Sequence, residues 1–197
     1  MTELLAALVL FAASASFTPG PNNIMLTASG ATFGFRRTVP HILGVVLGFP
    51  AMVAAVGLGL GTLLAAVPAI HAVLKYAGAA YLCYLAWLVA ISGRGGGAEA
   101  AGSPLGFWRA AAFQWVNPKG WVMAVGAIST FTSTGGNIVR DVLLIALVFL
   151  LVGLPSTMTW TVFGTLIGRW LGSGRRLRLF NMAMGGLLLL SVIPALA

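Results

Sequence analysis

The sequence predicts an all-α, polytopic membrane protein, and three observations lead to this class. Hydrophobic residues make up 59% of the 197-residue chain and charged residues only 7%, whereas charged residues form roughly 25% of a soluble domain. The few charges leave long uncharged stretches, such as residues 4–35 and 38–74. A bilayer crossing needs about 20 apolar residues. The chain therefore has room for six short spans, in a single transmembrane domain over residues 1–197.

The six spans are expected between the loops that carry the charges. The run from Leu4 to Phe17 is too short to cross a bilayer at about 1.5 Å per residue, so the first span must continue past Thr18–Asn23. Glu3 stands where a signal peptide would have its positive region, which favours a first span instead. The expected spans are residues 4–32, His41 to Leu64, Ile70 to Ile91, Trp108 to Phe131, Val142 to Gly168 and Leu179 to Ala197.

Several of these spans are expected to be interrupted by proline, which removes a backbone donor and kinks or unwinds a helix. Two prolines and a glycine interrupt the first span, and Asn117-Pro118 interrupts the fourth. Gly153 and Pro155 predict a break in the fifth span, and Val67-Pro68 predicts the turn before the third.

The two halves of the chain resemble each other in outline. The matching pairs are Asn22 and Asn117, Pro50 and Pro155, and Gly78 and Gly185. A glycine-rich, linker-like stretch lies between the halves, at residues 92–104. These matches predict two three-helix repeats, over about 1–92 and 105–197. An odd number of spans per repeat gives the repeats opposite orientations in the membrane.

Lysine and arginine are concentrated in the first, third and fifth expected loops. These residues are Arg36, Arg37, Arg94, Arg109, Arg169, Arg175, Arg176 and Arg178. Because cytoplasmic loops carry the excess of positive charge, the odd loops are expected in the cytoplasm and both termini outside it. A five-span alternative would move one terminus.

The two polar breaks are the candidate solute site. Helix N-terminal ends favour a carboxylate and C-terminal ends favour a cation, so a pair of broken helices suits an amino acid. The alternative is that the prolines only kink the helices for packing. The candidate substrate-binding residues are Thr18, Pro19, Gly20, Pro21, Asn22, Asn23, Gln114, Asn117, Pro118 and Lys119.

Lys119 is the one cation placed well inside an expected span, where a charge is costly and points to function. Three roles are open for it: contact with a substrate carboxylate, a tether to the unwound backbone of the first helix, or snorkelling to the membrane interface. Acidic residues are scarce and lie near expected boundaries, which favours small neutral amino acids over cationic ones. Asp141, His41 and His71 are the only candidate proton carriers, and each is better explained as a boundary or helix-end residue.

Other classes find little support. The sequence has no P-loop, His-Glu-x-x-His or Gly-x-Ser-x-Gly motif, so no enzyme, cofactor or metal site is predicted. Scattered basic residues give no nucleic-acid-binding surface, and the lone Cys83 gives no disulfide framework. The expected partners are a small solute and membrane lipid, with a homo-oligomer left open. A non-transporting membrane subunit and a passive channel remain alternatives.

The motifs at the breaks resemble those of the LysE/RhtB amino-acid exporters. The resemblance spans the whole chain and rests on Phe17–Asn23 followed by Gly34-Phe35-Arg36, on Gly78–Leu82 and on Phe113–Lys119. It implies an exporter of amino acids and their relatives in the bacterial cytoplasmic membrane, driven by the proton gradient as an antiporter.

Within that family, three segments are similar to the cysteine/O-acetylserine exporters: Pro21–Asn23, Leu85–Trp87 and Ser129–Phe131. One position departs from the family pattern. Phe49 follows the Gly44–Gly48 pair, where many members carry an acidic residue. This departure puts a carry-over of cation recognition or proton coupling in doubt.

Overall fold

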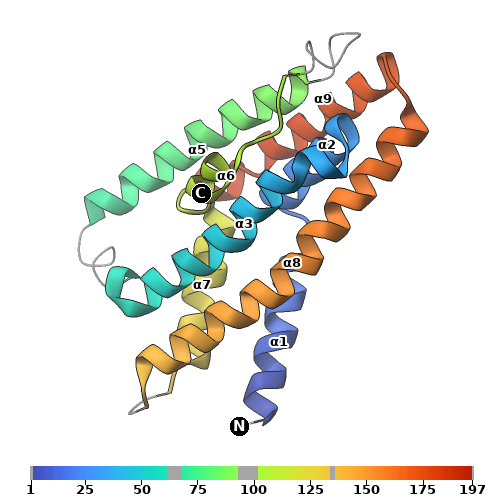
Figure 1. Ribbon diagram of the computed structural model, residues 1–197. Coiled ribbons are helices and arrows are strands. Elements are labelled where there is room, and N and C mark those ends of the chain that lie inside the picture. Colours follow the sequence, from blue (N-terminus) through green and yellow to red (C-terminus); the bar gives the residue numbers. More distant parts are fainter. Residues whose placement is uncertain (1, 62–67, 93–101, 134–135, 197) are drawn as a thin grey trace.

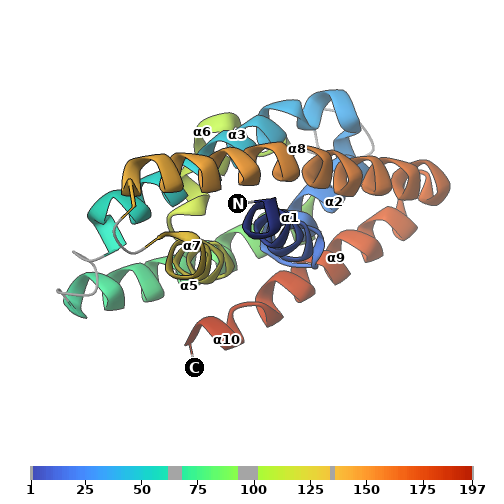
Figure 2. The same ribbon diagram turned by 90° about the horizontal axis from the view of Figure 1, so that it is seen from below.

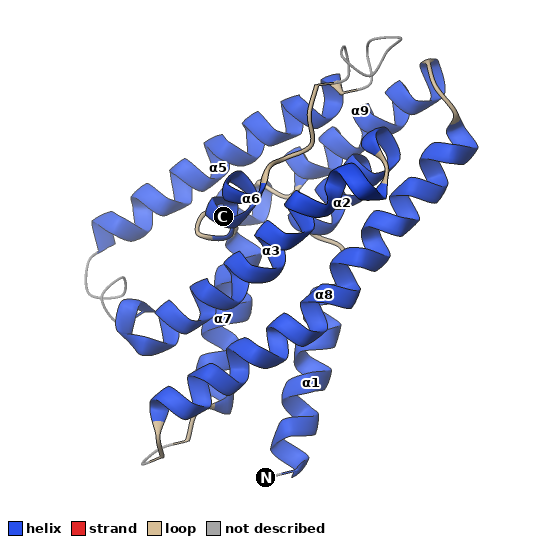
Figure 3. Cartoon of the chain, viewed as in Figure 1, coloured by secondary structure: helices blue, strands red, loops and turns tan. Residues whose placement is uncertain are grey.

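A computed structural model describes residues 2–61, 68–92, 102–133 and 136–196 of the chain (Figure 1). All secondary structure in these residues is helical, which confirms the all-α class (Figure 3). The elements are α1 (Thr2–Phe17), α2 (Pro21–Phe33), α3 (Phe35–Ala55), the π-helical turn η1 (Val56–Leu60), α5 (Pro68–Ile91), α6 (Phe107–Gln114), α7 (Pro118–Phe131), α8 (Ile138–Leu171), α9 (Arg175–Leu190) and α10 (Ile193–Leu196).

Three helical segments in the described part of the chain are long and apolar enough to cross a membrane: Phe35–Leu60, Val73–Ile91 and Ile138–Leu171. A fourth candidate is the pair α1 and α2, which is bent by 54° and forms either a broken span or a re-entrant loop. The helices α6, α7 and α9 have 8, 14 and 16 residues and are too short to cross alone. The six-span inverted repeat therefore stays a prediction.

The outer surface has the character expected of a protein in lipid. Large apolar side chains along α8 are exposed, including Leu151 at 60% and Leu166 at 55%. Monomeric soluble proteins rarely expose contiguous apolar surface on this scale. The exposed face of α8 is thus suited to lipid contact.

The second expected span begins earlier than predicted. α3 starts at Phe35 rather than His41, and a single residue, Gly34, connects it to α2 with a φ of 78°. The Thr38 hydroxyl donates to the Gly34 carbonyl at 2.9 Å and helps to close the first turn. Arg36 and Arg37, expected in a loop, lie exposed in that first turn. The expected Val67-Pro68 turn and the glycine-rich stretch at 93–101 lie outside the described residues, except that Pro68 begins α5.

The predicted break in the fifth span is wrong. α8 runs without interruption from Ile138 to Leu171, with Pro155 inside it. The Thr157 hydroxyl donates to the carbonyls of Gly153 and Leu154, each at 2.9 Å. Pro155 lacks the N–H that would bond the Leu151 carbonyl, but membrane helices tolerate a proline where their surroundings satisfy the freed backbone group.

The last expected span is shifted and divided. α9 begins at Arg175, four residues before the predicted Leu179, and ends at Leu190, where α10 follows after a short turn. Pro194 has no N–H to bond the Leu190 carbonyl, so the regular helical pattern stops there. The predicted end, Ala197, lies outside the described residues.

Glycines allow the central helices to pack closely. A Cβ added at Gly164 of α8 would collide with the backbone of Thr27 in α2, and one at Gly30 would collide with the backbone of Thr161. The Gly44–Gly48 pair packs in the same way against α6, where a Cβ on Gly48 would lie 2.7 Å from the Ala111 Cα. α2 is consequently buried beside α8 in the middle of the molecule (Figures 1 and 2).

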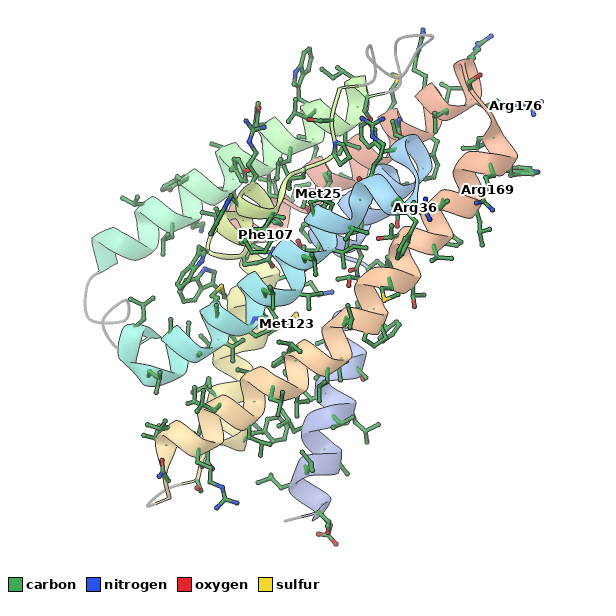
Figure 4. All side chains as sticks on the ribbon, in the orientation of Figure 1. Met25, Arg36, Phe107, Met123, Arg169 and Arg176 are labelled. Atoms are coloured by element: carbon green, nitrogen blue, oxygen red, sulfur yellow. The ribbon has the colours of Figure 1, made fainter. Side chains whose placement is uncertain are left out.

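Positive charge gathers at one end of the helices. The labelled side chains Arg36, Arg169 and Arg176 lie at the same end of the molecule (Figure 4). The connection between α2 and α3 and the connection between α8 and α9 both lie at this end (Figure 1). We call it the arginine end.

Candidate functional site

The first break separates α1 from α2 and leaves helix-end carbonyls that other side chains bind. The Ser16 carbonyl accepts hydrogen bonds from Asn23 Nδ2 at 2.9 Å and from Ser156 Oγ at 2.8 Å. The Thr18 carbonyl accepts from Asn23 Nδ2 at 3.0 Å and from Lys119 Nζ at 2.6 Å. These two carbonyls are therefore already occupied by donors of the protein, although the sequence had suggested that this helix end would be open to a cation.

The second break separates α6 from α7 and leaves one acceptor free. Asn117 precedes Pro118 in extended backbone geometry, with φ −82° and ψ 108°, and its side chain makes no capping hydrogen bond. The Asn117 side chain is 3% exposed, and its Oδ1 has no hydrogen-bond partner. A buried amide oxygen usually has a partner, so this atom is suited to accept a hydrogen bond from a bound molecule.

The structure brings the two breaks together. Asn22 Nδ2 donates to Gln114 Oε1 at 2.8 Å, and Gln114 Nε2 donates back to Asn22 Oδ1 at 3.2 Å. The Lys119 ammonium reaches Thr18 across the same junction. This contact corresponds to the tether to the unwound backbone, one of the three roles considered from the sequence.

A cavity of about 60 Å³ lies at this junction, and we call it the break cavity. Six of the ten predicted site residues line it: Gly20, Pro21, Asn22, Asn23, Asn117 and Lys119. Thr18, Pro19, Gln114 and Pro118 do not line it, although Thr18 and Gln114 hold the two breaks together.

Residues of α3 and α8 that were not predicted from the sequence complete the walls of the cavity. Ser156 and Thr157 line the cavity from α8, and Phe49 and Phe149 form an apolar side with their rings edge to face at 5.1 Å. Ser156 and Thr157, the two hydroxyl residues directly after Pro155, are the sequence signal that could have identified the wall formed by α8. Hydroxyl groups beside a proline in a membrane helix often form hydrogen bonds to the backbone or to a ligand.

The electrostatic character of the break cavity favours an anionic group. α2 and α7 both begin beside it with a proline, and neither has a side-chain cap on its first turn. The first amides of a helix have no acceptor within the helix and carry its positive dipole end. Lys119 adds a full positive charge at the same place. Two helix N-termini and an ammonium group thus border the cavity that Asn117 also lines.

The two described candidates for proton transfer lie outside the break cavity. Asp141 accepts from the backbone N–H and the hydroxyl of Ser133, at 3.0 and 2.6 Å, which fits the boundary role expected for it. His41 was expected at a helix end, but it is 1% exposed inside α3 and borders a second cavity. In the described part of the chain, no group of three or more His, Cys, Asp or Glu residues could hold a metal ion. The side chain of His71 lies outside the description.

These features define a helical membrane protein whose broken helices meet at a small polar centre. The profile of the LysE type translocator family matches residues 13–193, and the chain therefore belongs to this family. Its relatives include a cysteine/O-acetylserine efflux protein of Escherichia coli (strain K12), 33% identical over 168 residues that cover 84% of this chain and 85% of the relative.

A second relative with the same name occurs in Salmonella typhimurium (strain LT2) and is 32% identical over 167 residues, with the same coverage of both chains. No solved structure shows a significant match to this chain. The family resemblance noted from the sequence is thus confirmed.

Proposed function

We propose that this protein exports small neutral amino acids or their derivatives, of the cysteine and O-acetylserine type, across the bacterial cytoplasmic membrane. The observation that carries the proposal is the junction of the two breaks, where α2, α7, Lys119 and Asn117, whose Oδ1 has no hydrogen-bond partner, border one cavity. The relatives named as efflux proteins support the direction of transport and the class of solute.

The donors and acceptors at the break cavity complement an α-amino acid. The carboxylate would lie at the first turns of α2 and α7 near Lys119, where amides and positive charge favour it. The ammonium would donate to Asn117 Oδ1. The apolar side formed by Phe49 and Phe149 would face the side chain of the solute. No acidic residue lines the break cavity in the described chain, and this agrees with a solute that carries no second positive charge.

Transport would require this cavity to enlarge. Its volume of about 60 Å³ is far below the roughly 300–1,000 Å³ of pockets that hold drug-sized ligands. We propose that the two repeats, residues 1–92 and 105–197, form six spans and rock about the junction, so that it opens to each side in turn. Proton antiport would drive the cycle, as the family resemblance implies.

The orientation follows from the arginine end. Positive residues gather there (Figure 4), and the positive-inside rule assigns such an end to the cytoplasm. We therefore propose that both termini lie outside the cytoplasm. A reporter that is active only in the cytoplasm, fused after Ala197, should remain inactive, and an active fusion would reverse this orientation.

The proposed function is tested by efflux from bacterial cells that overproduce the protein. Cells preloaded with labelled O-acetylserine or cysteine should release it faster than cells without the protein. Asn117→Ala should abolish this gain, because it removes the free acceptor, while Asn22→Ala should reduce it by loosening the contact with Gln114. Asn137→Ala is the matched control, since Asn137 caps α8 away from the cavity.

The outcome also separates the alternatives. Normal efflux by both Asn117→Ala and Asn22→Ala, at wild-type membrane levels, would remove the proposed site. Efflux that continues after an uncoupler collapses the proton gradient would favour a passive channel over an antiporter. No efflux of any amino acid tested would favour a non-transporting membrane subunit.

A further inference from the structure

A second and larger cavity lies between α2, α3 and the second half of α5, closed on one side by the segment that leads into α6. Its volume is about 310 Å³, and we call it the His41 cavity. In Figure 4, Met25, which lines it, lies nearer the arginine end than Met123, which lines the break cavity. The His41 cavity thus lies on the side proposed to face the cytoplasm.

His41 borders this cavity with an imidazole that has no partner. Its side chain is 1% exposed, and neither ring nitrogen makes a hydrogen bond. Ser29, which also lines the cavity, is already bonded to Thr38 at 2.9 Å. A buried polar group without a partner is rare and costly in folded proteins. The imidazole is therefore the lining group most in need of a ligand.

The charge of the lining indicates which chemical group is accepted. Arg109 at the start of α6 is the charged residue among those that line the His41 cavity, and no acidic residue in the described chain lines it. A guanidinium group binds a carboxylate with two parallel hydrogen bonds. A neutral imidazole nitrogen can accept a hydrogen bond from an ammonium group. The two side chains together suit the two ends of a zwitterion.

The His41 cavity lies next to the break cavity along the same helices. His41, Val45 and Phe49 follow each other at four-residue spacing on one face of α3, and the last two line the break cavity. Four residues of α-helix advance by about 6 Å. Along α2, Met25 and Ser29 line the His41 cavity and the preceding turn lines the break cavity. A solute would therefore move between the two sites by about one helical turn.

We propose that the His41 cavity is a second solute site, in which Arg109 binds the carboxylate and His41 the ammonium group of an amino acid before it reaches the break cavity. The inference rests on the proposed function for the choice of solute. The His41 cavity has a volume of about 310 Å³, which reaches the lower part of the range seen for ligand pockets, roughly 300–1,000 Å³. The site can thus hold a solute without the enlargement that the break cavity requires.

The test is equilibrium binding of labelled O-acetylserine to the purified, full-length protein in lipid nanodiscs. The wild-type protein should bind two molecules per chain. His41→Leu and Arg109→Gln should each reduce the number of bound molecules to one, held in the break cavity. Asn117→Ala should instead remove the molecule bound in the break cavity. His41→Gln keeps a hydrogen-bonding group and should restore at least part of the lost binding, which separates a binding role from a packing role. Arg169→Gln is the matched control, since Arg169 is exposed at the same end but does not line the cavity.

The results distinguish the inference from the proposed function. One molecule per chain in the wild type, unchanged by His41→Leu and Arg109→Gln but lost in Asn117→Ala, would overturn the second site and leave the exporter intact. Equal loss in His41→Leu and His41→Gln, with unchanged binding in Arg109→Gln, would also overturn it. Binding of no amino acid at all would reject the proposed function itself.

Discussion

Each of the two breaks has an asparagine beside a proline, but the surroundings of the two breaks differ. At the first break, the Ser16 and Thr18 carbonyls each accept two hydrogen bonds from side chains of α2, α7 and α8. At the second break, Asn117 Oδ1 is buried without a partner. α2 is buried along most of its length, whereas α7 buries only Gly120, Ala124 and Ala127. The first break is thus fixed by the protein, and the second retains an unused hydrogen-bonding group.

This difference suggests a division of roles between the halves. α2 is held against α8 by backbone contacts at Gly30 and Gly164, so it forms a rigid wall. α7 has fewer buried residues, and Lys119 connects it to the first break. A solute that binds Asn117 would satisfy the second break.

The largest effect is expected where α2 meets α8. Gly164→Ala would place a methyl group against the Thr27 backbone, and overpacking of this kind costs about 1–3 kcal/mol. The free energy of unfolding in detergent, followed by helical circular dichroism during denaturant titration, should fall by that amount. The matched control is Gly153→Ala in the same helix, where an added Cβ meets nothing within 4 Å. Equal stability of the two variants would show that α2 is not held by this close contact.

A smaller effect is expected at the tether between the breaks. Lys119→Met removes the donor to the Thr18 carbonyl and a positive charge beside the break cavity. Hydrogen bonds to charged groups contribute about 1.5–3 kcal/mol; this one is exposed, so the low end applies and efflux of O-acetylserine should fall about tenfold. Lys119→Arg keeps the charge and should retain part of the activity.

The other lysine of the chain provides the control for this effect. Lys75→Met, on α5, should leave efflux within about twofold of wild type, a difference of only about 0.4 kcal/mol. If Lys119→Met and Lys75→Met behave alike at equal membrane levels, the ammonium group at the junction has no role in transport.

The sequence was sufficient to predict the features that depend on local chemistry. Long uncharged runs predicted membrane helices, Pro19 and Pro21 predicted the break before α2, and Pro118 predicted the break before α7. The same rule failed at Pro155, where α8 stays continuous, because a membrane helix tolerates a proline where its surroundings satisfy the freed carbonyl. The sequence alone does not reveal the surroundings that a given proline will meet.

Features that depend on tertiary contacts could not be predicted in this way. His41 was assigned to a span end because α3 was expected to begin there, but α3 begins at Phe35 and buries the imidazole beside a cavity. Ser156 was not recognised as a site residue, since its bond to the Ser16 carbonyl joins positions far apart in sequence. The sequence predicted the paired breaks, but the walls that enclose them come from α3 and α8.

The central claim, that the solute binds between the two breaks, is tested most directly by protection from alkylation. Met123→Cys places a thiol on the wall of the break cavity, and Val122→Cys places one at the neighbouring position, which is 74% exposed on the outer face of α7. Both variants would carry Cys83→Ser to remove the natural thiol. In membranes treated with N-ethylmaleimide, O-acetylserine should slow alkylation of the Met123→Cys variant about tenfold and leave the Val122→Cys variant unchanged. An alkylation rate of the Met123→Cys variant that is the same with and without saturating solute would contradict the account.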